Sequence, residues 1–219
     1  MARSLRYGAR ALLVHLGLWL LLAGAAPVPK LVWAFGDSLA AGYGLPPQQG
    51  FAAQLQAALR RSGIAADVRN GGVAGDTAAQ GRARLLWGLR GLGRKPDLVI
   101  VELGANDMLR GLPPAQARAN LDRILAELQR RRIPVLLAGM RAAPNLGPAY
   151  ARAFEGMYPE LARRRGVPLY PFFMAGVAGE RALIQPDGLH PNARGVAVIV
   201  RRMLPAVRAA LARQSTGSR

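Results

Sequence analysis

Residues 34–44 read Ala34-Phe35-Gly36-Asp37-Ser38-Leu39-Ala40-Ala41-Gly42-Tyr43-Gly44 and follow directly from an apolar run that begins at Lys30. An apolar run that stops at a Gly-Asp pair, followed by a Gly-rich segment, is typical of a buried strand that leads into a tight turn. Open α/β sheets bind their ligands at the carboxyl ends of such strands. Ser38 is therefore predicted to lie at the ligand-binding edge of a sheet.

Ser38 is also the one serine of the chain that follows a predicted buried strand; the others are Ser4, Ser62, Ser215 and Ser218. The chain has no cysteine, which excludes thiol chemistry and disulfides. It has two histidines, and His15 lies in an apolar N-terminal segment. His190 is therefore the candidate general base, because imidazole titrates near neutral pH.

The rest of the chain alternates between predicted strands and predicted helices. Strands are expected at residues 30–35, 65–69, 98–103, 134–138 and 167–170. Helices are expected at residues 51–61, 77–92, 113–132, 148–165 and 192–212, the last kinked or broken at Pro205. This alternation predicts a single α/β domain with three layers, built on a doubly wound parallel sheet of about five strands.

Four polar, Gly-rich turns fall at strand ends or on the last long connection, at residues 36–38, 71–76, 104–107 and 187–190. In a doubly wound sheet these turns meet at one crevice, although they are far apart in sequence. The sequence therefore predicts one composite site that all four turns build.

The residues of these turns suit acyl transfer. Ser38 can act as nucleophile if His190 removes its proton, and Asp187, three residues before His190, can orient the imidazole. The oxyanion of the tetrahedral intermediate needs hydrogen-bond donors. The candidates are the backbone N–H of Ser38, an N–H in the Gly75 turn and the side-chain amide of Asn106.

The same four turns resemble the sequence blocks of the SGNH (GDSL) hydrolases, in particular the exported thioesterase I / lysophospholipase L1 / arylesterase group. The matching segments are Gly36-Asp37-Ser38-Leu39, Gly75-Asp76-Thr77, Gly104-Ala105-Asn106-Asp107 and Asp187-Gly188-Leu189-His190-Pro191. The resemblance extends from about Lys30 to Arg208. It implies a flavodoxin-like sheet of order 2-1-3-4-5 and a Ser38-His190-Asp187 triad. It also implies an oxyanion hole of Ser38, Gly75 and Asn106, with no metal and no cofactor. Ala105 is a departure, since close relatives often have a second glycine there.

The chain of 219 residues carries a formal net charge of +18, almost entirely from arginine. Three arginine clusters, at residues 60–61, 130–132 and 163–165, fall at predicted helix C-termini, where cations interact favourably with the helix dipole. Few aromatic residues are interleaved with them, so the stacking surface of a single-strand binder is missing. We expect solvated helix ends, no nucleic-acid partner and weak attraction to anionic membranes.

The first 25 residues resemble a signal peptide, with a basic start, an apolar segment from Ala11 to Leu22 and a small-x-small cleavage site at 23–25. The apolar segment is shorter than the ~20 residues that span a bilayer. An uncleaved N-terminal anchor is the alternative. We expect a hydrolase domain at residues 30–213, a disordered tail at 214–219, and a periplasmic or secreted protein.

These patterns lead to the hypothesis of a serine hydrolase that cleaves carboxylic esters, and thioesters in addition, in small-molecule substrates. An apolar surface for the acyl or aryl group is expected from Leu109, Leu112, Ala142, Ala143, Pro144 and Phe173. Alternatives are an esterase for sugar or peptidoglycan O-acetyl groups, transfer of the acyl group to an acceptor other than water, and a basic binder of nucleic acid or anionic membranes without catalysis. The sequence leaves the oligomeric state open, with a monomer favoured.

Overall fold

The computed structural model describes residues 28–213, and the structural statements below refer to this part of the chain. The predicted leader at 1–25 and the predicted tail at 214–219 lie outside the described residues. The strands are β1 (Lys30–Gly36), β2 (Ala66–Gly72), β3 (Leu98–Glu102), β4 (Val135–Ala138) and β5 (Leu169–Tyr170). The helices are α2 (Ser38–Ala41), α3 (Phe51–Arg61), α4 (Ala78–Gly91), α5 (Ala105–Leu109), α6 (Pro114–Arg130), α7 (Gly147–Arg165) and α8 (Ala193–Ala212). Short 3₁₀ turns occupy Pro47–Gln49, Pro144–Leu146 and Arg181–Leu183.

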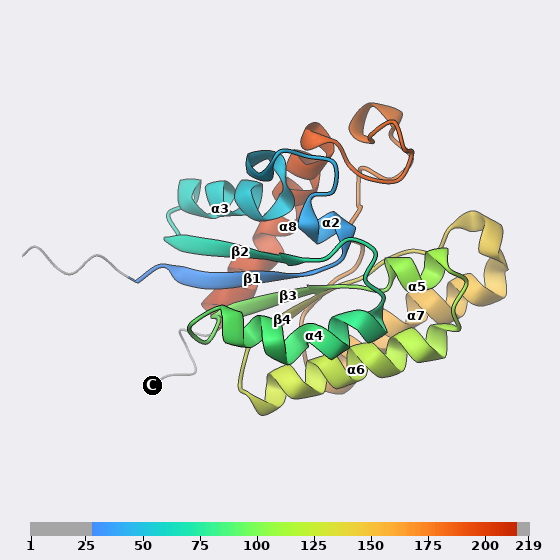
Figure 1. Ribbon diagram of the computed structural model, residues 1–219, viewed down its shortest axis with the longest axis horizontal. Coiled ribbons are helices and arrows are strands. Elements are labelled where there is room, and N and C mark those ends of the chain that lie inside the picture. The colour runs from blue at the N-terminus through green and yellow to red at the C-terminus, as the bar shows by residue number, and fades with distance from the viewer. Residues whose placement is uncertain (1–27, 214–219) are drawn as a thin grey trace, which may run out of the picture.

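The strands form one parallel sheet in the order β2-β1-β3-β4-β5, which confirms the predicted fold class and strand order (Figure 1). Their carboxyl ends are in register. Gly36 pairs with Gly72 on one side and with Glu102 on the other. Glu102 in turn pairs with Ala138, and Ala138 with Tyr170. The loops that follow the strands therefore leave the sheet from a single edge, where α2 and α5 also lie.

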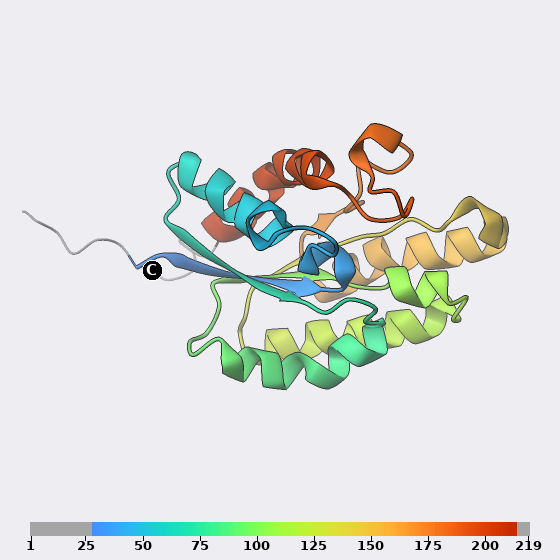
Figure 2. The same ribbon diagram turned by 45° about the horizontal axis from the view of Figure 1, so that its top comes forward.

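Helices cover both faces of the sheet and give the predicted three layers (Figure 2). Helices α3 and α8 pack together over one face, and α4, α6 and α7 pack side by side over the other. None of the helices within residues 28–213 is long and apolar enough to cross a membrane.

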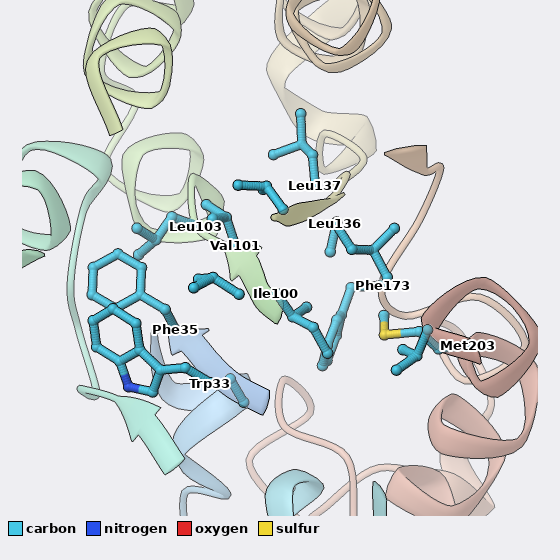
Figure 3. Close-up of a cluster of buried hydrophobic side chains, with 14 of the residues drawn as sticks. Trp33, Phe35, Ile100, Val101, Leu103, Leu136, Leu137, Phe173 and Met203 are labelled. Carbon is cyan, nitrogen blue, oxygen red and sulfur yellow. The ribbon is translucent and has the colours of Figure 1, made fainter. Parts of the chain in front are cut away.

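The three central strands, β1, β3 and β4, are buried between these layers because they are apolar on both faces. All five residues of β3 are buried, as expected for a central parallel strand. Trp33 and Phe35 of β1 lie on one face with their ring centroids 4.5 Å apart, as Figure 3 shows. Gly88 of α4 lets the helix approach Trp33, because a Cβ there would lie 2.7 Å from the indole ring. Burying a side chain of this size stabilises the fold by about 1.5–3 kcal/mol.

Two predicted boundaries move because tertiary contacts extend an element. Strand β2 continues to Gly72, beyond the expected end at residue 69, because Asn70, Gly71 and Gly72 pair with β1. Helix α8 continues through Pro205 to Ala212, so the expectation that proline breaks it is wrong. Five buried side chains on both sides of that proline hold the helix on the core: Ile199, Val200, Met203, Val207 and Leu211. This packing offsets the hydrogen bond that proline cannot donate.

The arginine clusters lie at helix ends, as expected. Arg60 and Arg61 lie in the last turn of α3, and residues 163–165 in the last turn of α7. Helix α6 ends at Arg130, two residues before the predicted end, and Arg132 follows with a φ of 54°. Arg130 and Arg131 pair with Glu127, while Arg164 and Arg165 pair with Asp122. Much of this positive charge therefore belongs to local ion pairs at the surface.

Candidate active site

Ser38 is the first residue of α2, the short helix that follows β1. Asp37 caps this helix, since its Oδ1 accepts a hydrogen bond from the Leu39 N–H at 3.0 Å. Gly42, in the left-handed conformation, ends the helix after four residues. Ser38 is nearly buried, with 9% of its surface exposed. The tight strand-helix junction therefore fixes the backbone of the serine and leaves its hydroxyl at the sheet edge.

His190 and Asp187 lie on the loop before α8, and the Asp187 carboxylate is hydrogen-bonded to the backbone of this loop. Asp187 Oδ1 accepts hydrogen bonds from the backbone N–H groups of Leu189 and His190, at 2.9 and 3.0 Å. Its Oδ2 lies 2.6 Å from His190 Nδ1. These contacts, with the His190 N–H foremost, lower the pKa of Asp187 to about 2. The carboxylate is therefore ionised at neutral pH and favours a proton on Nδ1.

The same imidazole reaches Ser38, because His190 Nε2 lies 2.9 Å from Ser38 Oγ. With Nδ1 protonated toward Asp187, Nε2 is free to accept the serine proton. The structure thus brings Ser38, His190 and Asp187 into one hydrogen-bonded chain, as the sequence predicts. The exposed ring of Tyr43 lies against His190, with ring centroids 4.6 Å apart.

The three predicted oxyanion donors lie at the same sheet edge. Within residues 28–213, the backbone N–H groups of Ser38 and Gly75 have no hydrogen-bond partner. Gly75 has a φ of 86°, a conformation that favours glycine. The Asn106 side chain donates to Asp37 Oδ2 and to the Asp76 carbonyl, both at 3.1 Å. Asn106 thus links the Asp37-Ser38 turn to the Gly75 turn.

Further polar residues hold these turns in place, and sequence reasoning did not assign them a role. Buried Asp107 accepts a hydrogen bond from the Ala78 N–H at 2.7 Å and so ties α5 to the start of α4. Arg84 of α4 pairs with Asp76 and donates to the carbonyls of Gly71 and Gly36, at 2.9 and 2.8 Å. The signal available in the sequence was Asp107 itself, next to Asn106 in the third block.

The residues that follow Gly75 form the N-terminal cap of α4. Thr77 caps the helix and forms a capping box with Gln80. Asp76 takes no part in this capping and is paired with Arg84. Arg110, at the end of α5, donates to the Gly75 carbonyl at 2.7 Å. Gly75 is therefore held at its carbonyl oxygen, while its N–H has no acceptor within residues 28–213.

The expected acyl surface is open and only partly as predicted. Leu109 is exposed by 48%, Leu112, Ala142 and Ala143 are half-buried, and Pro144 is exposed. Phe173 has no exposed surface and packs on Phe51, with ring centroids 5.1 Å apart. Figure 3 shows it beside Met203 in the core. The expectation that Phe173 contacts an acyl group is therefore corrected: it is a core residue.

The exposed apolar side chains gather instead around the triad. Seven large hydrophobic residues of the described chain are exposed. Four of them lie on the four Gly-rich turns or close to them in sequence: Tyr43, Val73, Leu109 and Leu189. We call these four residues the apolar rim. By contrast, the groove of about 500 Å³ between α3 and α8 contains none of the site residues. No group of three or more His, Cys, Asp and Glu side chains within residues 28–213 is arranged to hold a metal ion.

Comparison with known proteins agrees with this geometry. The GDSL-like Lipase/Acylhydrolase family pattern matches residues 34–198. Esterase TesA of Pseudomonas aeruginosa is 40% identical over 182 residues, covering 83% of this chain and 90% of that protein. Thioesterase 1/protease 1/lysophospholipase L1 of Escherichia coli K12 is 39% identical over 172 residues, covering 78% and 80%. The crystal structure of AlinE4, an SGNH-hydrolase family esterase, is 52% identical with a TM-score of 0.73, and the match covers 85% of this chain and 99% of that one.

Proposed function

This chain belongs to the GDSL-like lipase/acylhydrolase family, and we propose that it hydrolyses carboxylic esters, and thioesters in addition, through an acyl-enzyme on Ser38. The observation that carries this proposal is the hydrogen-bonded chain Ser38–His190–Asp187, with contacts of 2.9 and 2.6 Å. The relatives support the reaction class, since their names include an esterase and a thioesterase.

In the proposed reaction, His190 Nε2 takes the proton of Ser38 as the hydroxyl attacks the acyl carbonyl. The ionised Asp187 stabilises the imidazolium that forms. His190 then gives the proton to the leaving alcohol or thiol, which completes the acyl-enzyme. In the second half, His190 removes a proton from water, the resulting hydroxide attacks the acyl carbonyl, and Ser38 Oγ leaves with the proton.

The oxyanion of each tetrahedral intermediate is proposed to rest on the free N–H groups of Ser38 and Gly75 and on the Asn106 amide. The two N–H groups need no rearrangement, because no other acceptor occupies them. Asn106 differs, since both of its amide hydrogens already have acceptors. We infer that one of these contacts, to Asp37 or to the Asp76 carbonyl, is exchanged for the oxyanion as charge develops.

The substrate's acyl or aryl group is proposed to lie on the apolar rim, together with Leu112 and the 142–144 loop. This surface is open to solvent, so it suits an acyl chain that lies along the protein rather than one enclosed by it. The test is the hydrolysis of p-nitrophenyl esters of rising chain length. Leu109→Ser should weaken the preference for longer chains, while Trp87→Ser, an exposed residue on α4, should leave it unchanged. An unchanged preference in Leu109→Ser would remove the rim from the proposal.

The protein is further proposed to be exported by its N-terminal segment and to act in the periplasm or outside the cell, with weak attraction to anionic membranes. The segment's charge pattern and the net charge of +18 support this. N-terminal sequencing of protein recovered from the periplasmic fraction tests it. A retained Met1 in a cytoplasmic fraction would contradict export.

The experiment that tests the function is labelling with a fluorophosphonate, followed by mass mapping of the adduct. The wild type should carry one adduct, on Ser38. Ser38→Ala should carry none, and His190→Ala should react far more slowly. Ser62→Ala is the matched control, because Ser62 only caps the end of α3. Labelling that persists in Ser38→Ala, or a wild type that does not react, would refute the proposal.

A further inference from the structure

Glu102 is a buried acid that the proposed reaction does not use. It is the last residue of β3 and pairs in the sheet with Gly36, the residue two before the nucleophile. Its exposed fraction is 1%. Acidic side chains are almost never buried so completely without a partner, so the position of Glu102 needs a physical reason.

One oxygen of Glu102 holds the nucleophile helix. Oε2 accepts hydrogen bonds from the backbone N–H groups of Asp37 and Ala40, at 3.3 and 3.2 Å. These two residues flank Ser38 and Leu39 at the start of α2. A side chain on Gly36 would place its Cβ 2.5 Å from this oxygen. The glycine before Asp37 and Ser38 is therefore needed partly because the Glu102 carboxyl group occupies that space.

The other oxygen has no partner. Oε1 is the single buried side-chain oxygen or nitrogen within residues 28–213 that forms no hydrogen bond. An ionised carboxylate in this position would leave part of its charge unsolvated, which is strongly unfavourable. The Asp37 carboxyl group, itself fully buried, lies next to it, and two neighbouring carboxylates oppose each other's ionisation.

These effects act in the same direction on the protonation of Glu102. Burial, and then the charge of Asp37, raise the pKa of Glu102 well above its usual value. Burial also raises the pKa of Asp37, to about 6, but Leu39 and Asn106 favour its charged form by hydrogen bonding. Both oxygens of Asp37 accept N–H hydrogen bonds, from Leu39 and from Asn106, whereas Oε1 of Glu102 has no donor, so of the two acids the proton is favoured on Glu102.

We propose that Glu102 is a positioning residue that, as the neutral acid, anchors the N-terminus of α2 and so aims the Ser38 hydroxyl at His190. This rests on the proposed function of Ser38. The neutral form matters because the reaction builds negative charge on an oxygen held by the Ser38 N–H. A second carboxylate under the same helix would repel that charge. The uncharged carboxyl group accepts the two N–H bonds without this penalty.

The test compares Glu102→Gln, Glu102→Ala and Ile100→Ala by the rate of fluorophosphonate labelling and by Tm. Gln is neutral and can accept the same N–H bonds, so Glu102→Gln should label close to the wild-type rate. Glu102→Ala removes the anchor and should label about 100-fold more slowly, the scale expected for a small misplacement of a reacting group. Ile100→Ala leaves a cavity two residues earlier on β3, and should lower Tm without slowing the labelling of folded protein.

Each outcome decides the proposal. Wild-type labelling of Glu102→Ala would overturn the positioning role. If Glu102→Gln labels as slowly as Glu102→Ala, the claim that Glu102 acts in its neutral form is overturned. If Glu102→Ala does not fold, infrared spectroscopy of the wild type and Glu102→Gln at neutral pH decides. The carbonyl band of a protonated carboxyl group should be present in the wild type and absent from the variant. This band does not depend on catalysis, so its absence overturns the inference even if Ser38 is the nucleophile.

Discussion

Replacing Arg84 with methionine should lower the stability of the fold strongly. The guanidinium group ties three points at the carboxyl edge of the sheet: the Asp76 carboxylate, the Gly71 carbonyl and the Gly36 carbonyl. It also lies over the ring of Phe35, 4.4 Å from the ring centroid. Methionine keeps most of the apolar volume of the side chain and removes all of these polar contacts.

The expected loss follows from the burial of Asp76. The Arg84 and Asp76 side chains are exposed by 19% and 9%, and removing one partner of such a buried pair costs about 3–5 kcal/mol. The two carbonyls lose donors, but water can replace part of that loss because the site is not fully closed. We therefore expect the free energy of unfolding to fall by about 4 kcal/mol, within a typical total of about 5–15 kcal/mol. For a domain of this size, that lowers Tm by about 8–16 °C.

Urea unfolding of Arg84→Met, Asp76→Asn and the double variant measures the effect and its origin. The free energy of unfolding of the double variant should fall by much less than the sum of the two single losses, because the second substitution removes the charge that the first one leaves without a partner. Arg118→Met is the matched control. Arg118 pairs with Glu160 at 2.7 Å, but both side chains are 43% exposed, so this pair should contribute below about 1 kcal/mol. If Arg84→Met loses no more than Arg118→Met, or if the two single effects simply add, the reasoning is refuted.

Three further outcomes are expected. Asn106→Ala should lower kcat by about 10²–10³-fold with a small change in KM; a rise in KM of that size with kcat unchanged would show that the amide binds the substrate and the transition state equally, and would contradict an oxyanion role. Asp187→Asn should lower kcat by about 10³–10⁴-fold while Ser38 stays in place, which steady-state kinetics together with Tm would check. Asp37 has its pKa raised from 3.8 to about 6 in the folded chain, so its ionisation destabilises the fold above about pH 6 and has little effect below about pH 4. The Asn amide cannot accept from both Leu39 and Asn106, which costs stability at every pH, but the difference between Asp37→Asn and the wild type should shift in favour of the variant by up to about 3 kcal/mol of unfolding free energy between pH 4 and pH 7.5. Urea unfolding in which this difference stays constant, or shifts toward the wild type, would contradict the prediction.

The fold was predictable because its signals are local and repeated. Apolar runs, glycines and helix-period patterns alternate along the chain, and each run such as residues 98–103 has few readings other than a buried strand. Element ends were less predictable. Asn70 to Gly72 look like a turn until β1 supplies the hydrogen bonds that make them a strand. Pro205 looks like a break until the packing of α8 outweighs it.

The meeting of Ser38, His190 and Asp187 was predictable because few residues of the chain could take the roles of a nucleophile and a general base. One histidine follows the N-terminal segment, and one serine follows a buried strand. The supporting residues were not. Glu102 sits at the end of an apolar strand, and Arg84 is one of many arginines on a helix, so nothing local shows that their side chains turn inward toward the nucleophile. Phe173 was misassigned for a related reason. It follows other apolar residues in the sequence, and its contact with Phe51, which places it in the core, is visible only in the folded structure.

Ser38 and His190 are 152 positions apart, one at the first strand and the other just before the last helix. Until residues 187–190 have been synthesised and packed against the sheet edge, the chain therefore holds a serine with no imidazole beside it. Domains generally fold as units, and here a complete sheet would have no hydrolytic activity until the segment that carries His190 packs against it. Any proteolytic fragment that ends before His190 should likewise have no hydrolytic activity, even if it folds.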